Sequence, residues 1–121
     1  MAIYIGVTTV VVAGTSGPLL GDGTNTSVAM QNSPGSNFTQ FINQAVRQGF
    51  DVGRILLFAR KANSGDVYIG GVGVTSTTGV ALSPREMLPI GTGQVNDMNV
   101  GDLDVNADTT GDKVFFILEV K

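Results

Sequence analysis

Residues 67–84, VYIGGVGVTSTTGVALSP, decide which class of fold this chain can adopt. An apolar run into clustered glycines is typical of a dinucleotide site, which needs G-x-G-x-x-G followed at once by a helix whose N-terminal amides hold the pyrophosphate. Gly71 and Gly73 supply only the first half of that pattern, because Ser76 stands at its third glycine position. Residues 77–84 are poor material for a helix, and no Gly-Lys-Ser/Thr of a P-loop follows. We therefore predict a strand followed by turns.

The glycines of this stretch are then expected to have structural roles. They allow a β-bulge or a close approach of backbone between packed layers. The turn glycines to which we assign this role are Gly70, Gly71, Gly73 and Gly79.

Strand patterns also dominate the rest of the chain. Short apolar segments separated by turn residues are expected to be strands at 2–13, 55–59, 67–74, 80–82, 87–90, 98–105 and 113–120. Residues 63–66 (NSGD) tolerate positive φ, so we expect them to close a hairpin between 55–59 and 67–74. Short strands at this spacing favour a mainly β fold, an antiparallel β-sandwich or jelly-roll-like barrel, over a parallel α/β sheet.

One short amphipathic helix is expected at residues 38–46. Its apolar side chains lie at positions i, i+3, i+4, i+7 and i+8, and they are Phe38, Phe41, Ile42, Ala45 and Val46. Ser36 or Asn37 can cap its start and Gly49 can end it. Packing on the protein's own sheet is the expected role, and docking on a partner is the alternative.

The N-terminal part of the chain is almost without charge, since Asp22 is the single charged residue among the first 46. Residues 2–13 are too short for a membrane helix and lack the basic start of a signal peptide, so they predict one strand, or two with a bend at Gly6. Residues 14–37 are rich in loop residues. Within a single domain of 121 residues, we interpret 1–36 as a low-charge strand and loop that forms either an arm against another protein or an ordinary surface loop.

Composition argues against several function classes. The chain has no Cys and no His, which excludes disulfides, thiolate metal sites and the usual catalytic triad. Its seven Lys and Arg residues are scattered in the sequence and the net charge is −3, so nucleic-acid binding is not expected. We predict no catalytic residue, no cofactor and no membrane partner. The chain has only two glutamates, and we find no convincing pair of acids for a carboxylate hydrolase.

An acidic segment at 102–108 (DLDVNAD) resembles the start of a calcium loop. Alternation places Asp102, Asp104 and Asn106 on one face of an extended segment, where oxygen ligands would suit calcium. An EF-hand would need Gly at 107 and Glu at 113, where the chain has Ala and Lys. We expect a solvated acidic face with Leu103 and Val105 pointing inward, and no metal site.

The last strand, 113–120 (KVFFILEV), is apolar on both faces. Val114, Phe116, Leu118 and Val120 share one face, and Phe115 and Ile117 lie on the other. A central strand covered on both sides has this pattern, and so has an edge strand covered by another subunit.

Four short motifs in the second half of the chain resemble a pattern of small β-rich structural proteins of tailed bacteriophages. The pattern comprises a strand ending in V-Y-I/V-G-G, a V-T-x-x-x-G turn, an apolar-x-P step and a C-terminal strand. The corresponding residues here are 67–71, 74–79, 82–84 and 114–120. The chain has Arg85-Glu86 where these proteins usually have Gly-Glu, and the helix at 38–46 has no obvious counterpart in them.

The resemblance implies a non-enzymatic virion component, in the first place a capsid decoration or cement protein on the outer surface of the capsid. Its partner would be the major capsid protein, and a homo-oligomer such as a trimer would stabilise the shell. The residues expected at a capsid or subunit interface are Ile3, Tyr4, Ile5, Val7, Phe115 and Ile117. The alternative is a carbohydrate- or receptor-binding module of a tail or head fibre, although the chain has no Trp and only two Tyr as sugar platforms.

Overall fold

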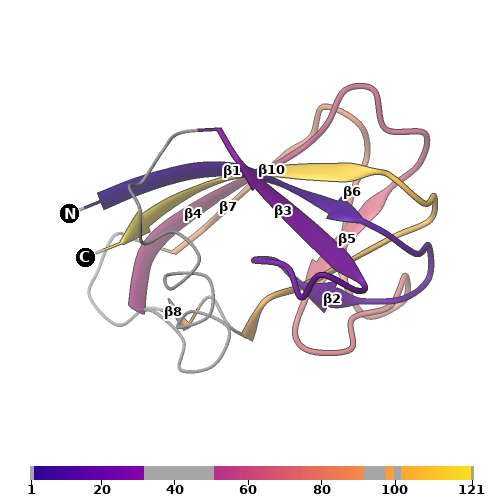
Figure 1. Cartoon of the computed structure of the whole chain (residues 1–121), viewed down its shortest axis with the longest axis horizontal. Helices are drawn as coiled ribbons and strands as arrows, with labels where there is room; N and C mark the ends of the chain where they lie inside the picture. Colours follow the sequence, from indigo (N-terminus) through magenta and orange to yellow (C-terminus); the bar gives the residue numbers. More distant parts are fainter. Residues whose placement is uncertain (1, 32–50, 92–97, 100–101, 121) are drawn as a thin grey trace.

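The computed structural model describes residues 2–31, 51–91, 98–99 and 102–120, which form two antiparallel β-sheets (Figure 1). The larger sheet has the order β3 (Thr26–Met30), β1 (Ala2–Val10), β10 (Lys113–Val120), β4 (Asp51–Ala59), β7 (Met87–Ile90), and β8 (Met98–Asn99) pairs with β4. The smaller sheet has the order β2 (Gly17–Pro18), β9 (Asp104–Ala107), β5 (Val67–Gly70), β6 (Val80–Leu82). The prediction of a mainly β, antiparallel fold is confirmed.

Strand β10 is the centre of the larger sheet. It pairs with β1 on one side and β4 on the other, so it is a central strand and not an edge strand. Val114, Phe116 and Leu118 are fully buried, as their alternation predicts. Gly6 lies opposite Phe116 in β1, and a Cβ at Gly6 would come within 2.6 Å of the Phe116 ring. Gly6 therefore leaves room for that ring. Strand β1 is one continuous strand, without the bend at Gly6 that the sequence allowed.

The hydrophobic core lies between the two sheets. Each contributes alternate residues that are essentially inaccessible to water, among them Ile55 and Leu57 of the larger sheet and Val67 and Val105 of the smaller one. Burying such a side chain completely stabilises the fold by about 1.5–3 kcal/mol relative to leaving it exposed. Burial of these side chains therefore holds the two sheets together. Within the described part of the chain, no helix has the length and apolar character needed to cross a membrane.

The predicted hairpin between 55–59 and 67–74 is wrong. Strand β4 belongs to the larger sheet and β5 to the smaller one, and β5 ends at Gly70. The NSGD turn binds the start of β10 instead of closing a hairpin. The Asn63 side chain donates to the Lys113 carbonyl (2.8 Å) and accepts from the Lys113 amide (2.8 Å). The buried Asp112 carboxylate accepts the amides of Ser64 (3.0 Å) and Gly65 (2.9 Å).

The described part of the 1–36 segment, residues 2–31, contains three strands that pair within the fold. Strand β1 pairs within its own chain, with β10 and with β3. Leu19 and Leu20 are buried, and the Thr8 hydroxyl donates to the Leu19 carbonyl. The helix predicted at 38–46 lies outside the described residues, as does the end of the 1–36 segment.

Asp22, the single charge of the N-terminal region, holds a local turn. Its Oδ1 accepts the backbone amides of Thr24 (2.8 Å), Asn25 (2.8 Å) and Thr26 (3.1 Å). Burial raises the pKa of Asp22, but these hydrogen bonds outweigh it, so the pKa lies below its ordinary value of 3.8. This charge therefore acts within the fold, between β2 and β3.

Candidate functional site

The side of the larger sheet that faces away from the smaller one is apolar across four strands. Residues opposite each other in antiparallel strands share a face, and the registers join Ile5, Ile117, Leu56 and Pro89 in one row and Val7, Phe115, Phe58 and Met87 in the next. Ile3 extends the surface along β1. We call this surface the apolar face; it comprises Ile3, Ile5, Val7, Leu56, Phe58, Met87, Pro89, Phe115 and Ile117.

Several side chains of the apolar face are accessible to water. Ile3 is 52% exposed, Met87 is 52% exposed and Ile5 is 37% exposed. Phe115 and Ile117 are half-buried, although the strand partners on both sides of β10 are in place. Leu56 and Phe58 are also half-buried, and Val7 is buried at 9% exposure. Partly exposed apolar surface that extends over several strands is typical of interaction sites.

Five of the six residues predicted at an interface lie on the apolar face, and Tyr4 does not. Tyr4 stands opposite Leu118 and packs against the core, because successive residues of a strand point to opposite sides. Ile3, Ile5 and Val7 share the outward side with Phe115 and Ile117. The sequence analysis missed Leu56, Phe58, Met87 and Pro89, although the period of two within 55–59 and 87–90 could have found them once the strand order was known.

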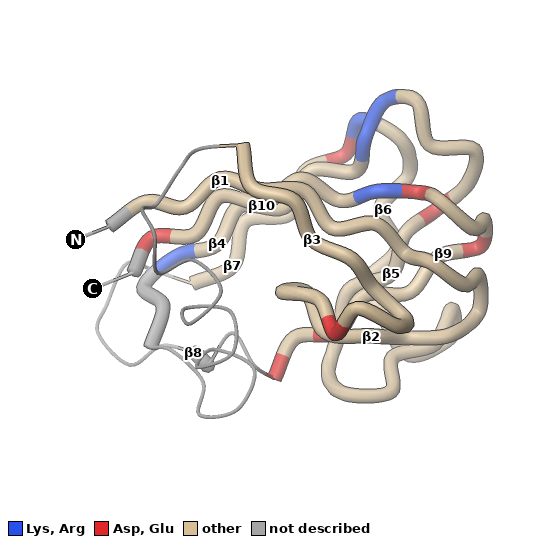
Figure 2. The backbone as a smooth tube through the Cα atoms, in the orientation of Figure 1, with Lys and Arg blue, Asp and Glu red and all other residues tan. Residues whose placement is uncertain are grey.

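Basic residues gather at one end of the apolar face. The Arg60 amide donates to the Lys113 carbonyl (3.2 Å), and the Arg85 amide donates to the Ala59 carbonyl (3.0 Å), so residues far apart in sequence meet there, with Lys61 adjacent. Figure 2 shows most of the described Lys and Arg positions grouped toward one end of the molecule. Four of the five described cations, Arg60, Lys61, Arg85 and Lys113, therefore lie at this end, although only Arg60 and Lys61 are neighbours in the sequence. An apolar centre with a charged rim is the usual anatomy of a protein interface.

The expectation of a solvated acidic face in 102–108 is wrong for Asp104 and Asn106, whereas Asp102 is exposed. Asp104 and Asn106 are buried at 6% and 4% exposure, because the connection between β5 and β6, residues 71–79, covers them. Asp104 Oδ2 accepts the Gly73 amide (3.1 Å), and Asn106 Nδ2 donates to the Val74 carbonyl (3.0 Å). Both polar side chains therefore anchor this connection. Val105 is buried as predicted, and among the residues that the structure describes no group of three or more acids is arranged to hold a metal ion.

Close packing explains two of the four turn glycines. A Cβ at Gly70 or at Gly79 would lie 2.7 or 2.6 Å from Val74 Cγ2, so only glycine fits under the Val74 side chain. Gly73 has a positive φ of 80°, which favours glycine. At Gly71 a Cβ would meet nothing within 4 Å, and we find no structural reason for glycine there.

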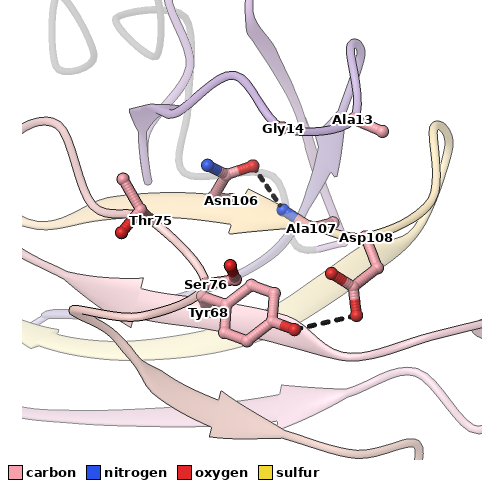
Figure 3. Close-up of a pocket in the computed structure, with 8 residues that line it drawn as sticks. All are labelled: Ala13, Gly14, Tyr68, Thr75, Ser76, Asn106, Ala107 and Asp108. Atoms are coloured by element: carbon pink, nitrogen blue, oxygen red, sulfur yellow. Dashed lines mark hydrogen bonds between the residues drawn. The ribbon is translucent and has the colours of Figure 1, made fainter.

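The same connection borders a polar pocket with a volume of about 300 Å³ on the smaller sheet (Figure 3). Tyr68, Thr75, Ser76 and Asp108 contribute polar groups to its wall, and Ala13 and Gly14 line it from the loop after β1. The Tyr68 hydroxyl donates to Asp108 Oδ2 (2.8 Å). This hydrogen bond, burial, and the negative charges of Asp108 and Asp66 raise the pKa of Tyr68 above its ordinary value of 10.0.

Sequence reasoning did not find this pocket. Its residues come from the loop after β1, from β5, from the 71–79 connection and from the end of β9, and no local pattern relates them. The pairing of Tyr68 with Asn106 places these two residues on one face of the smaller sheet. Chemically, the pocket offers one carboxylate, several hydroxyls and an aromatic ring, which are groups for recognising a polar ligand.

Comparison with known proteins does not assign a function to the apolar face or to the polar pocket. A scan against family models, a search of curated proteins and a search of solved structures each found no match to this chain.

Proposed function

We propose that this chain is a non-enzymatic structural protein of a bacteriophage virion, a decoration or cement protein that binds the outer surface of the capsid through the apolar face. The observation that carries the proposal is the apolar face itself, which brings Ile3, Ile5, Val7, Phe115 and Ile117 together. Its partner is the major capsid protein, and copies of the chain assemble into oligomers, such as trimers, on the shell. The two sheets form a β-sandwich in this proposal.

The anatomy of the apolar face supports a role in binding a protein surface. Exposed aliphatic and half-buried aromatic side chains form its centre, and the cations Arg60 and Lys113 lie at its rim. A decoration protein must hold shallow contacts across a large shell, and an open, slightly twisted sheet face provides such contacts without a deep groove. The exposed Glu86 lies beside Arg85 at this end, so the rim carries charges of both signs and favours a partner with complementary charges.

The backbone at Arg85 supports the resemblance to phage structural proteins. Arg85 stands where those proteins usually carry Gly, and its φ of 77° is the left-handed conformation that glycine adopts without strain. The turn is held further by Glu86 Oε1, which accepts the Ser83 amide (2.8 Å). A turn of the same shape would explain why glycine is usual at this position.

The first experiment is quantitative mass spectrometry of purified virions, comparing the copy number of this chain with that of the major capsid protein. A copy number of the same order is expected for a decoration protein. A much lower number would move the chain to the tail, the neck or a vertex, and its absence from virions would refute the proposal.

The second experiment tests the apolar face directly. We expect the variant I3Q/M87Q to lose binding to shells prepared without this protein by about tenfold or more, because it replaces the two most exposed large apolar side chains of the apolar face with polar ones. The matched control is V80Q, since Val80 is also 52% exposed but lies on β6 of the smaller sheet. Equal binding by both variants in a co-sedimentation assay would remove the apolar face from the proposal.

A carbohydrate- or receptor-binding module of a tail or head fibre is the second candidate, and the polar pocket is the observation that favours it. Low copy number in virions together with glycan binding would support this candidate over a decoration protein.

A further inference from the structure

The polar pocket lies on a different sheet from the apolar face, so a ligand can bind there while the apolar face contacts another protein. It sits on the side of the smaller sheet that the 71–79 connection covers. Its volume of about 300 Å³ is at the lower end of the range of small-molecule sites. A ligand of this size is a single ring or one side chain.

The groups in the wall can both donate and accept hydrogen bonds. Asp108 is exposed, and Tyr68 occupies only its Oδ2, so Oδ1 can accept from a ligand. Ser76 is exposed and makes no hydrogen bond within the described part of the chain, so its hydroxyl is available to donate and accept. A polyhydroxylated ligand uses both kinds of group, whereas an ammonium ion uses only acceptors.

The charges near the pocket argue against an anionic ligand. Asp108 and Asp66 are adjacent, since the Asp108 amide donates to the Asp66 carbonyl (3.1 Å). Four of the five described cations, Arg60, Lys61, Arg85 and Lys113, gather around the start of β10 and the β6–β7 connection, and neither they nor Arg54 line the pocket. A single carboxylate acceptor in a neutral wall is suited to a charge-assisted hydrogen bond from a hydroxyl.

The pocket also contains apolar surface, and hydrogen bonds within the protein hold its wall in place before a ligand binds. Figure 3 shows the Tyr68 ring on one side of the space, with Ala13 and Gly14 on the other side. The Tyr68 hydroxyl is held by Asp108. The side chains of Asp104 and Asn106 hold the connection that carries Ser76, through hydrogen bonds with its backbone. A preformed site with a ring and fixed polar groups loses little entropy when a ligand binds.

We infer that this pocket binds one neutral sugar residue, such as the terminal unit of a glycan, with Asp108 and Ser76 as the groups that bond its hydroxyls. The inference rests on the second candidate function, for which it names the ligand class and the binding groups, and it does not depend on the proposed attachment to a capsid. A decoration protein with this pocket would present a sugar-binding site on the sheet opposite its attachment face.

The test is an NMR titration of the ¹⁵N-labelled full chain with a panel of free neutral monosaccharides, with methylamine as the cationic probe and sialic acid as the anionic one. We expect at least one neutral sugar to shift the amides of Tyr68, Ser76 and Asp108. D108N and S76A should each weaken that binding by about tenfold or more. S27A is the matched control, because Ser27 is an exposed serine of β3 outside the pocket, and its affinity should equal that of the parent chain.

Three results would overturn the inference. The first is the absence of any shift at these amides with every neutral sugar up to its solubility limit. The second is a shift with methylamine or sialic acid alone, which would assign a different ligand class. The third is undiminished sugar affinity in both D108N and S76A when their amide spectra show the native fold. None of these results bears on capsid binding, which is measured on the other sheet.

Discussion

Individual side chains hold together segments that are distant in the sequence. Asp112 is almost fully buried and accepts two backbone amides from the turn at 63–66, and Asn63 forms two hydrogen bonds with the backbone of Lys113. In the smaller sheet, Asp104 and Asn106 hold the 71–79 connection in the same way. Buried polar groups are tolerated when they are satisfied, so these side chains fix the path of loops that the apolar core cannot specify.

The contact between Gly79 and Val74 gives the first prediction. G79A should lower the free energy of unfolding by about 1–3 kcal/mol, because its Cβ would overlap Val74 Cγ2 at 2.6 Å and approach Tyr68 Cβ at 3.0 Å. G71A is the matched control and should change stability by less than about 0.5 kcal/mol. Urea unfolding measures both. Equal effects of the two substitutions would contradict the packing role of Gly79.

The left-handed backbone of Arg85 gives the second prediction. R85G should raise the free energy of unfolding by up to about 1 kcal/mol, because glycine adopts a φ of 77° without the strain of a Cβ. R85A removes the same charge but keeps the Cβ, so it should not be stabilising. Thermal unfolding of the two variants separates backbone strain from charge, and stabilisation by R85A alone would assign the effect to charge.

The hydrogen bond between Tyr68 and Asp108 gives the third prediction. In a Tyr4→Phe background the phenolate absorbance should report Tyr68 with a pKa above 10.0, and D108N should move it back toward that value. Because the raised pKa belongs to the folded state, the stability from this bond is complete below pH 10 and declines as pH rises from about 10 through the folded pKa. A midpoint that D108N leaves unchanged would exclude Asp108 as the cause.

At the scale of elements, β1 and β10 each contribute side chains to both the core and the apolar face. Strand β1 lies between β3 and β10, and its residues Thr8 and Val10 are fully buried. Low charge in this part of the chain therefore reflects its position in the middle of a sheet. The exposed side of the same strands supplies much of the apolar face, so one element serves both the core and the proposed interface.

Deletion of residues 1–10 is the fourth prediction, and it should abolish the cooperative unfolding transition. The deletion removes the pairing partner of both β3 and β10 and opens the core around Phe116. Removal of residues 1–2 takes away only one cross-strand pair and should leave the transition in place. Circular dichroism and urea unfolding provide the measurement. A folded, cooperative product of the longer deletion would mean that β1 is dispensable and can act as an arm.

At the scale of the whole molecule, two surfaces of different chemistry lie on different sheets. The apolar face covers the outer side of the larger sheet, and the polar pocket lies on the smaller one. The shared core keeps the two in a fixed relation. One surface can therefore be occupied by a shell while the other remains open to a ligand.

Independence of the two surfaces is the fifth prediction. I3Q/M87Q should weaken shell binding and leave the response to the neutral sugar unchanged, and D108N should do the reverse. Their combination should show both losses additively, because the substituted residues share no partner. A combined variant whose shell affinity falls by much more than the product of the single effects would reveal coupling through the core.

The sequence alone predicts the mainly β class, the two faces of β10 and five of the nine residues of the apolar face, because a strand's period of two is a local property of the backbone. It also placed β6, β7 and β10 with their observed bounds. It did not determine which strands pair, since the NSGD turn is compatible with a hairpin until Asp112 and Asn63 bind it to β10. It could not find the burial of Asp104, the cluster of cations or the polar pocket either. These features appear only in the folded chain, because each depends on groups that folding brings together from positions tens of residues apart.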